Sequence, residues 1–316
     1  MNRLTTICVF FSLFTSFFSL NAYASSSDIN LDIKGSLAID NRNISGLVIT
    51  GSFVALATDE GTAIQILPKQ QGQFVSEKSG VVNLTNDGLE LDLEGLAWEE
   101  PFLYAIGSHS KKRKKIKDDA SEKKNLKRLA PIISEPSRHK LFQIELSPAG
   151  KVLNIQSKSL DEFISENEIL APFAVLPSKE NGIDIEGIAV KDKQLWIGFR
   201  GPVLRGNYAT ILELELKPKK FKLKKPELKL VNLGGLGIRD MVATDNGVKL
   251  LAGPMNEIPV LYQVLDWPGG NQFEALKPKT RIRDLHGKPE CLTIDPAGKV
   301  WIAEDGPKNG AIRLLD

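Results

Sequence analysis

One phrase occurs five times along this chain: a polar turn, a short apolar strand, a gap, and a second apolar strand that ends in a turn. Successive copies lie 49, 92, 53 and 51 residues apart when they are aligned at Gly46, Gly95, Gly187, Asp240 and Cys291. A period of about 50 residues built from short strands is typical of a β-propeller, in which each repeat forms one four-stranded blade. The repeat therefore predicts an all-β fold with five blades.

Further strands complete the blades. Alternating apolar and polar residues, as in LFQIEL from Leu141 and ATILELEL from Ala209, predict third strands with one buried face. The last repeat stops after its third strand, whereas residues 30–39 form a strand-like segment without a repeat of their own. We expect this N-terminal strand to pair beside residues 311–315 and so to close the ring.

The step of 92 residues leaves room either for a sixth blade or for an insertion in blade two. Residues 110–139, approximately, are mostly Lys, Ser, Asp and Glu, and they hold too few apolar residues to build a sheet. The sequence therefore favours five blades with a basic loop inserted in blade two. Residues 160–176 have apolar residues at helical spacing, which predicts a short helix between blades two and three.

The N-terminus resembles a secretory signal peptide. Arg3 precedes an apolar run, and an Ala-Tyr-Ala site ends at Ala24, so residues 1–24 are expected to be removed during export to the periplasm or the medium. An uncleaved membrane anchor is the alternative. Residues 25–316 would then form a single domain, expected to be monomeric, with no further segment apolar enough to span a bilayer. Cys291 is its only cysteine, so an internal disulfide is excluded, and a buried, inert thiol is expected.

The charge is unevenly distributed. The chain carries a net +2, but residues 111–128 hold ten Lys or Arg against three Asp or Glu, and residues 217–229 hold seven Lys against Glu227. The body is therefore acidic and carries two basic runs. Solvated lysine faces are the expected explanation, and contact with an anionic membrane surface is the alternative. Nucleic-acid binding is not expected.

The strand order brings charged residues of all blades together. The first strand of a blade lines the central channel, and its start lies beside the end of the antiparallel second strand. We expect a ligand to bind at this mouth through Glu94, His109, Glu186, Arg200, Arg239 and Glu290. Each glutamate could instead tie neighbouring blades together, and His109 could serve as a hydrogen-bonding residue. A cofactor cannot be assigned; a divalent cation such as calcium, held by the three glutamates, is one candidate.

Several phrases, in this order, resemble an uncharacterised bacterial family. They are EG at Glu94 with GSHS from Gly107, IEG from Ile185 with FRGP from Phe199, and GGLGIR, AGP and PE further on. The family is a domain of unknown function in the β-propeller group. The resemblance covers nearly all of residues 25–316, implies the propeller fold and brings no established activity.

Two classes of function remain open. The first is binding, or hydrolysis, of a small anionic or carbohydrate-like molecule at the acidic and arginine-bearing mouth. The second is a non-catalytic scaffold that presents loops to an envelope or extracellular protein. The sequence has no nucleophile elbow, no histidine-rich metal motif and no phosphate-binding loop, so no catalytic residue is assigned and enzymatic activity is left open.

Overall fold

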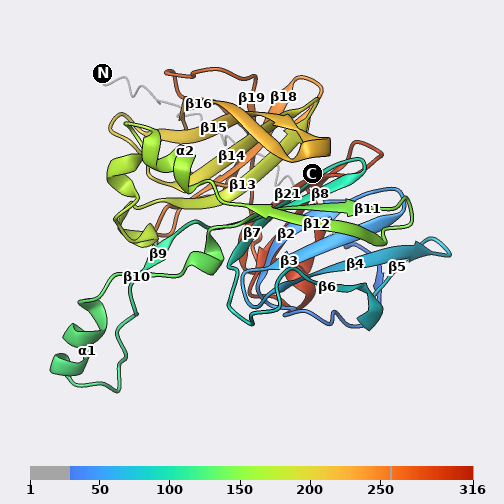
Figure 1. Ribbon diagram of the computed structural model, residues 1–316, viewed down its shortest axis with the longest axis horizontal. Coiled ribbons are helices and arrows are strands. Elements are labelled where there is room, and N and C mark those ends of the chain that lie inside the picture. Colours follow the sequence, from blue (N-terminus) through green and yellow to red (C-terminus); the bar gives the residue numbers. More distant parts are fainter. Residues whose placement is uncertain (1–28, 257, 316) are drawn as a thin grey trace, which may run out of the picture.

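The chain folds into a five-bladed β-propeller, as the repeat predicted (Figure 1). A computed structural model describes residues 29–256 and 258–315, so the expected signal peptide lies outside the described residues. None of the helices in this part of the chain has the length and apolar character that a bilayer crossing requires.

Each blade is an antiparallel meander that begins at the central channel. The strands of the five blades, in chain order, are β2 (Ile44–Ile49), β3 (Phe53–Thr58), β4 (Ala63–Gln70) and β6 (Val81–Asn83); β7 (Leu93–Glu99), β8 (Phe102–Gly107), β11 (Leu141–Leu146) and β12 (Val152–Lys158); β13 (Asp184–Lys191), β14 (Gln194–Gly201), β15 (Tyr208–Lys217) and β16 (Lys222–Asn232); β17 (Gly237–Thr244), β18 (Gly247–Gly253), β19 (Gln263–Trp267) and β20 (Pro278–Arg281); and β21 (Lys288–Ile294), β22 (Val300–Asp305) and β23 (Arg313–Leu314). The innermost strands contact one another in the ring order β2, β7, β13, β17, β21 and back to β2.

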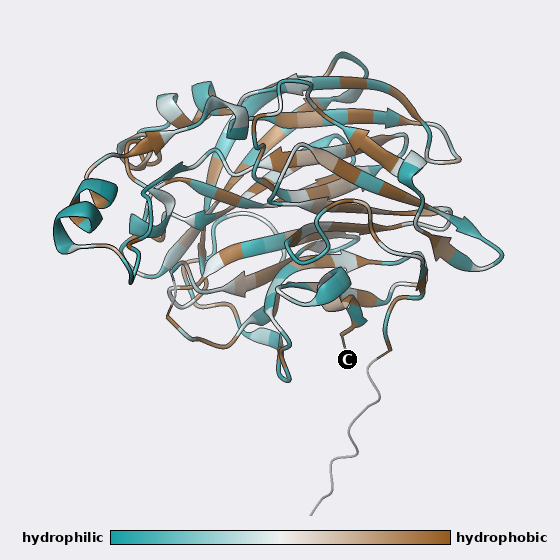
Figure 2. Cartoon of the chain, turned by 90° about the horizontal axis from the view of Figure 1, so that it is seen from below, coloured by the Kyte–Doolittle hydropathy of each residue, from teal (hydrophilic) through white to brown (hydrophobic). Residues whose placement is uncertain are grey.

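The core lies between the blades. Each of the five interfaces between neighbouring blades holds its own cluster of buried apolar side chains. Figure 2 shows the resulting alternation of hydrophobic and hydrophilic residues along many strands. Tyr104 and Trp301 belong to two of these clusters, and Trp196 packs against a third.

Every first strand contains one β-bulge, and all five bulges lie at the same place in the repeat. The pairing of first and second strands skips one residue of each first strand, namely Ser45, Glu94, Glu186, Arg239 and Glu290; in blade three it also skips Arg200 of β14. A bulge bends the strand and re-aims the side chain of the extra residue. The repeat thus builds a ring of five re-aimed side chains around the channel.

The residue after each bulge faces the next blade at close range. A Cβ atom on Gly95 would lie 2.9 Å from the carbonyl oxygen of Glu186, so only glycine fits there. In blade four the equivalent residue is Asp240, and its carboxylate accepts a 2.6 Å hydrogen bond from the backbone N–H of Leu292 in blade five. Polar ties between blades therefore exist at this position, and also at the bulge itself, where the hydroxyl of Ser45 in blade one donates to the carbonyl of Leu93 in blade two.

The N-terminal segment closes the ring in two steps. Asn30 forms an antiparallel bridge with Arg313, and the N–H of Leu31 donates to the carbonyl of Ile312, at 3.0 Å. This part confirms the expected pairing with the last blade. The next part does not follow the expectation: β1 (Ile33–Lys34) pairs in parallel with β5 (Gln73–Val75), a hairpin extension of blade one. The segment therefore holds blades five and one together.

The basic insertion is more ordered than the expected loop. Its strands β9 (Lys111–Lys112) and β10 (Ile133–Ser134) pair with each other, and α1 (Glu122–Leu129) lies between them. We call residues 111–134 the arm; it projects from the body of the propeller (Figure 1). The insertion lies in blade two as predicted, but its helix α1 was not predicted, because α1 buries no residue and is held by polar contacts instead.

Short helices fill the remaining connections. The helix expected between blades two and three is present as α2 (Asp161–Glu166), whose Ile164 joins the cluster between these blades. The 3-10 turns are η1 (Lys78–Gly80), η2 (Pro136–Arg138), η3 (Ala171–Phe173), η4 (Ser178–Glu180), η5 (Pro218–Lys220) and η6 (Lys308–Ala311).

Candidate functional site

A cavity of about 1010 Å³ opens at the mouth of the central channel. All five bulge residues line it, together with Arg200 and Asp305 near the ends of second strands. The base of the arm and the loop between β18 and β19 form the rest of its wall. Five of the six predicted site residues therefore lie in one cavity; that they bind a ligand stays a prediction.

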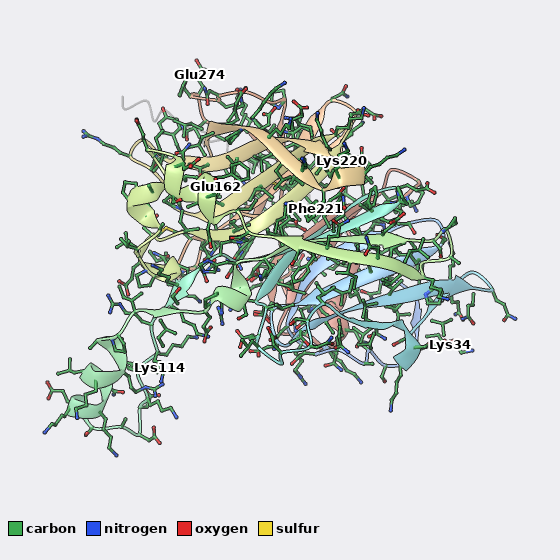
Figure 3. All side chains as sticks on the ribbon, viewed as in Figure 1. Lys34, Lys114, Glu162, Lys220, Phe221 and Glu274 are labelled. Atoms are coloured by element: carbon green, nitrogen blue, oxygen red, sulfur yellow. The ribbon has the colours of Figure 1, made fainter. Side chains whose placement is uncertain are left out.

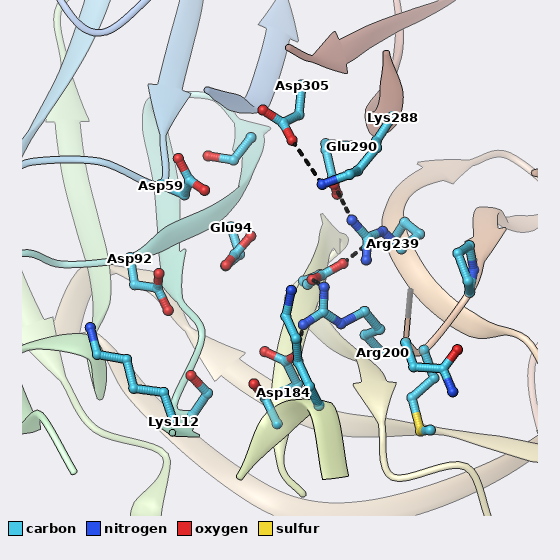
Figure 4. Close-up of a pocket in the computed structure, with 18 of the residues that line it drawn as sticks. Asp59, Asp92, Glu94, Lys112, Asp184, Arg200, Arg239, Lys288, Glu290 and Asp305 are labelled. Atoms are coloured by element: carbon cyan, nitrogen blue, oxygen red, sulfur yellow. Dashed lines mark hydrogen bonds and ion pairs between the residues drawn. The ribbon is translucent and has the colours of Figure 1, made fainter. Parts of the chain in front are cut away.

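One side of the mouth is a chain of alternating charges (Figure 4). Arg200 pairs with Asp184 and with Glu186, whose Oε1 lies 2.5 Å from Nη1. Arg239 lies between Glu186 and Glu290, with its Nε 2.9 Å from Oε2 of Glu186. The three bulge residues Glu186, Arg239 and Glu290 belong to blades three, four and five, so this chain of ion pairs ties three blades at the channel.

The chain of ion pairs is buried, and burial changes its titration. Burial raises the pKa of Asp184 to about 7 although Arg200 lowers it, and burial likewise raises the pKa of Glu186 to about 7 against the effect of both arginines. The same carboxylates hold the pKa of Arg200 and of Arg239 above its usual range. Both guanidinium groups are thus permanently charged and already engaged by protein carboxylates.

The opposite side of the mouth has carboxyl groups without such partners. Asp59 follows β3, and its buried Oδ1 has no hydrogen-bond partner within the described residues. Burial, together with nearby Asp92 and Asp305, raises the pKa of Asp59 to about 8. Glu94 makes no hydrogen bond or ion pair with any described residue; burial and neighbouring Glu186 raise its pKa well above the usual range. Figure 4 shows both side chains across the mouth from Arg200 and Arg239.

A second charged cluster lies where the insertion returns to blade two. Arg138 donates to Asp92 at 2.6 Å and pairs with Glu90, and Asp92 also accepts from the hydroxyl of Ser108. Arg138 is not among the residues predicted for the site. The signal for it was its position just before the third strand, whose start lies beside the end of the second strand at the mouth.

The expectation for His109 was wrong in placement. His109 has a φ of 51°, and its ring turns away from the cavity toward α2. Nδ1 lies 2.9 Å from the carbonyl oxygen of Gly107, and Nε2 accepts the backbone N–H of Leu160 at 3.1 Å. Burial lowers the pKa of His109 to about 4, so the ring is neutral and holds the helical connection in place.

The candidate cation site does not form as expected. Glu186 faces two arginines and Glu290 faces one, so the three glutamates do not converge on one point. Within the described ranges, no group of three His, Cys, Asp or Glu residues is arranged to hold a metal ion.

Cys291 is buried, and its Sγ lies 3.9 Å from the carbonyl oxygen of Ile44 in blade one. Burial raises the pKa of its thiol well above the usual range, as expected of an inert structural cysteine.

The fold and the mouth define the chain as a five-bladed β-propeller with a charged cavity at one end of its channel. A family model described as "Protein of unknown function (DUF3616)" matches residues 43–286. The chain belongs to this family, which agrees with the resemblance of its motifs. A search of curated proteins found no match.

Solved structures share the architecture. An endo-arabinase from Bacteroides thetaiotaomicron has a TM-score of 0.50 and 10% identity, over 91% of this chain and 98% of the enzyme. A glutaminyl cyclase from Myxococcus xanthus has a TM-score of 0.46 and 12% identity, over 91% of this chain and 99% of the enzyme. At these identities the likeness shows the fold alone.

Proposed function

We propose that the mouth of the channel binds a small carbohydrate-like ligand that carries an anionic group. The observation that carries the proposal is the cavity of about 1010 Å³ with two unpaired carboxyl groups, Asp59 and Glu94, on one wall. Its volume is at the upper end of small-molecule sites, roughly 300–1,000 Å³. Carboxyl groups in such a cavity can accept or donate hydrogen bonds to ligand hydroxyls, which supports a polyhydroxylated ligand.

The lysines at the rim of the cavity support the proposal that the ligand carries an anionic group. Five lysines line it: Lys112, Lys114, Lys115, Lys179 and Lys288. Lys112 lies 2.7 Å from Glu135, and Lys288 lies 3.5 Å from Asp305. Exposed ion pairs of this kind are weak, about 0–1 kcal/mol, so a ligand anion can replace the protein carboxylate. The buried Arg200 and Arg239, in contrast, are already paired with carboxylates that tie the blades together.

Tyr262 and Pro259 supply an apolar wall on the other side of the cavity. Such a wall can pack against the apolar face of a sugar ring, while the polar groups fix its orientation. Hydrolysis is the further part of the proposal: Asp59 with a pKa of about 8 is protonated at neutral pH, as a general acid requires.

A ligand screen tests the proposal. Thermal shift and calorimetry would compare glucose, glucuronic acid, glucose 6-phosphate and oligogalacturonate. We expect the acidic sugars to stabilise the protein, by about 2.7 kcal/mol at a hundredfold excess over Kd, and Glu94→Gln to remove this effect. Glu60→Gln is the matched control, because Glu60 is exposed and does not line the cavity. Reducing-sugar release from the oligomer reports hydrolysis. Absence of any shift with wild type, or normal binding by Glu94→Gln, would contradict the proposal.

A second candidate function is presentation of loops to a protein partner. It is supported by apolar side chains near the rim, since Ile258 is 60% exposed and Leu261 is 52% exposed. Leu261→Ser would weaken partner capture but leave sugar binding intact, because Leu261 does not line the cavity. Export with cleavage near Ala24 is also part of our proposal, and N-terminal sequencing of the protein from the periplasm or medium tests it.

A further inference from the structure

The arm is the most isolated part of the described molecule. Figure 3 shows it, with Lys114 labelled, standing away from the blades and covered with side chains that end in nitrogen. Helix α1 contributes no buried residue. Helix α1 therefore does not add to the core, and packing within the propeller does not explain its sequence.

The charge at the tip of the arm is not neutralised. Residues 111–128 carry ten basic and three acidic residues. The side chains of Lys117, Lys123, Lys124 and Lys127 make no ion pair with any described residue. The other basic run differs in its position, because most of its lysines lie on η5 and on β16, the outer strand of blade three, where Lys225 lies 2.7 Å from Glu215 and Lys229 lies 2.6 Å from Glu227. Among the described residues, the arm holds its cluster of lysines away from the blades.

Apolar side chains are exposed among these lysines. Leu126 is 60% exposed, Ile116 57% and Ile132 43%. Leu129 of the arm is exposed as well. Single exposed apolar residues are ordinary, but four on one arm of this size, beside several lysines, form an amphipathic surface. An anionic partner with an apolar interior would satisfy both kinds of side chain.

The arm presents this surface in a fixed shape. Asn125 accepts the N–H of Lys117 at 2.9 Å and donates to its carbonyl at 2.9 Å, which fastens the turn before α1. Arg128 donates to the carbonyl of Lys115 at 2.8 Å. At the base, Arg113 pairs with Glu180 of η4 at 2.5 Å. A surface that is already ordered loses less conformational entropy on binding than a flexible loop does.

We propose that the arm docks the protein onto an anionic lipid surface. The lysines would lie among the lipid headgroups, where each contributes about fivefold to binding, and Leu126 and Ile116 would insert at the boundary with the acyl chains. An acidic protein or polymer would also attract the lysines, but it would leave the exposed apolar side chains unexplained. This inference is independent of the ligand at the mouth, and it commits to lipid.

Vesicle co-sedimentation tests the proposal with the full chain. Vesicles of phosphatidylcholine alone are compared with vesicles that contain phosphatidylglycerol. One variant changes Lys117, Lys123, Lys124 and Lys127 to Gln. Its matched control changes Lys219, Lys220, Lys222 and Lys224 to Gln, so that the same charge is removed from the other basic run. A third variant carries Ile116→Ser and Leu126→Ser, and circular dichroism melting confirms that all of them fold.

We expect wild type to bind the anionic vesicles and to release them at high salt. The arm lysine variant should bind more weakly by on the order of a hundredfold or more, and the matched control should bind like wild type. The apolar variant should also lose affinity. Three results would each overturn the proposal: equal binding to neutral and anionic vesicles, equal loss in both lysine variants, or an apolar variant that binds like wild type. If the apolar variant binds vesicles like wild type and the protein also binds soluble polyglutamate, the partner is an acidic protein or polymer instead.

Discussion

Removing Arg239 should destabilise the ring more than any other single charge. Arg239 is 5% exposed and lies between the carboxylates of Glu186 and Glu290, which belong to the blades on either side of it. Arg239→Met keeps most of the aliphatic volume and removes only the guanidinium group. Two carboxylates would then face each other at the channel with one cation fewer.

The expected loss follows from the burial of these groups. Removing one partner of a buried ion pair typically costs about 3–5 kcal/mol, because the remaining charge is uncompensated. The loss should depend on pH, since Glu186 has a pKa of about 7 even with both arginines present. Without Arg239 its pKa rises further, so the native state binds more protons than the unfolded state over a wider range. The free energy of unfolding of the variant must then fall more steeply than that of wild type as pH rises.

Urea denaturation measures this difference. The destabilisation should be about 3–5 kcal/mol at roughly pH 8.5 and smaller, about 1–3 kcal/mol, at roughly pH 5.5, where protonated carboxyl groups replace the uncompensated charges. Arg205→Met is the matched control: Arg205 is exposed, and the same substitution there should stay within about 0.5 kcal/mol of wild type. A loss of stability below about 1 kcal/mol at the higher pH, or an equal loss at both pH values, would refute the role of Arg239 in tying the blades together.

Three further predictions concern other parts of the fold. Because the pKa of Asp59 is raised to about 8 in the folded protein, wild type loses stability as the pH rises from about 4 to about 8. In urea titrations, Asp59→Asn should therefore be more stable relative to wild type at high pH than at low pH. An equal stability difference at both pH values would contradict the raised pKa. Gly95→Ala should lower the free energy of unfolding by about 1–3 kcal/mol, because the new Cβ would lie 2.9 Å from a carbonyl oxygen. Gly51→Ala is the control and should not destabilise the protein, because Gly51 faces open space. Equal melting temperatures of the two variants would contradict the close packing at Gly95. Replacing residues 114–131 with a short Gly/Ser linker should leave the calorimetric melting temperature nearly unchanged, because α1 buries nothing; a large drop would show that the arm packs on the body.

The repeat made the number of blades and the end that carries the mouth predictable. The bulges were not predictable, because β2 is buried at all six of its residues and β13 at seven of its eight. A strand that is apolar on both faces shows no alternation, so a one-residue change of phase leaves no trace in its sequence.

The misplaced residues have physical causes as well. The left-handed conformation at His109 turns its ring toward α2, and a single residue with positive φ cannot be predicted from the local composition. Arg138 and Lys112 reach the cavity from an insertion without periodicity, so the only signal was the position of Arg138 just before the third strand. Helix α1 was not predicted because apolar periodicity reports a buried helix face, and this helix buries no residue.

The bulges also separate two kinds of constraint along the same strand. At Glu94 the side chain leaves the sheet for the channel, and it takes part neither in the packing between blades nor in an ion pair with a described residue. One residue later, at Gly95, even a methyl group has no room. Mutational tolerance should therefore change abruptly between adjacent positions. Substitutions at bulge positions such as Ser45 and Glu94 can thus change the side chains that line the mouth, while the packing of the ring of blades stays the same.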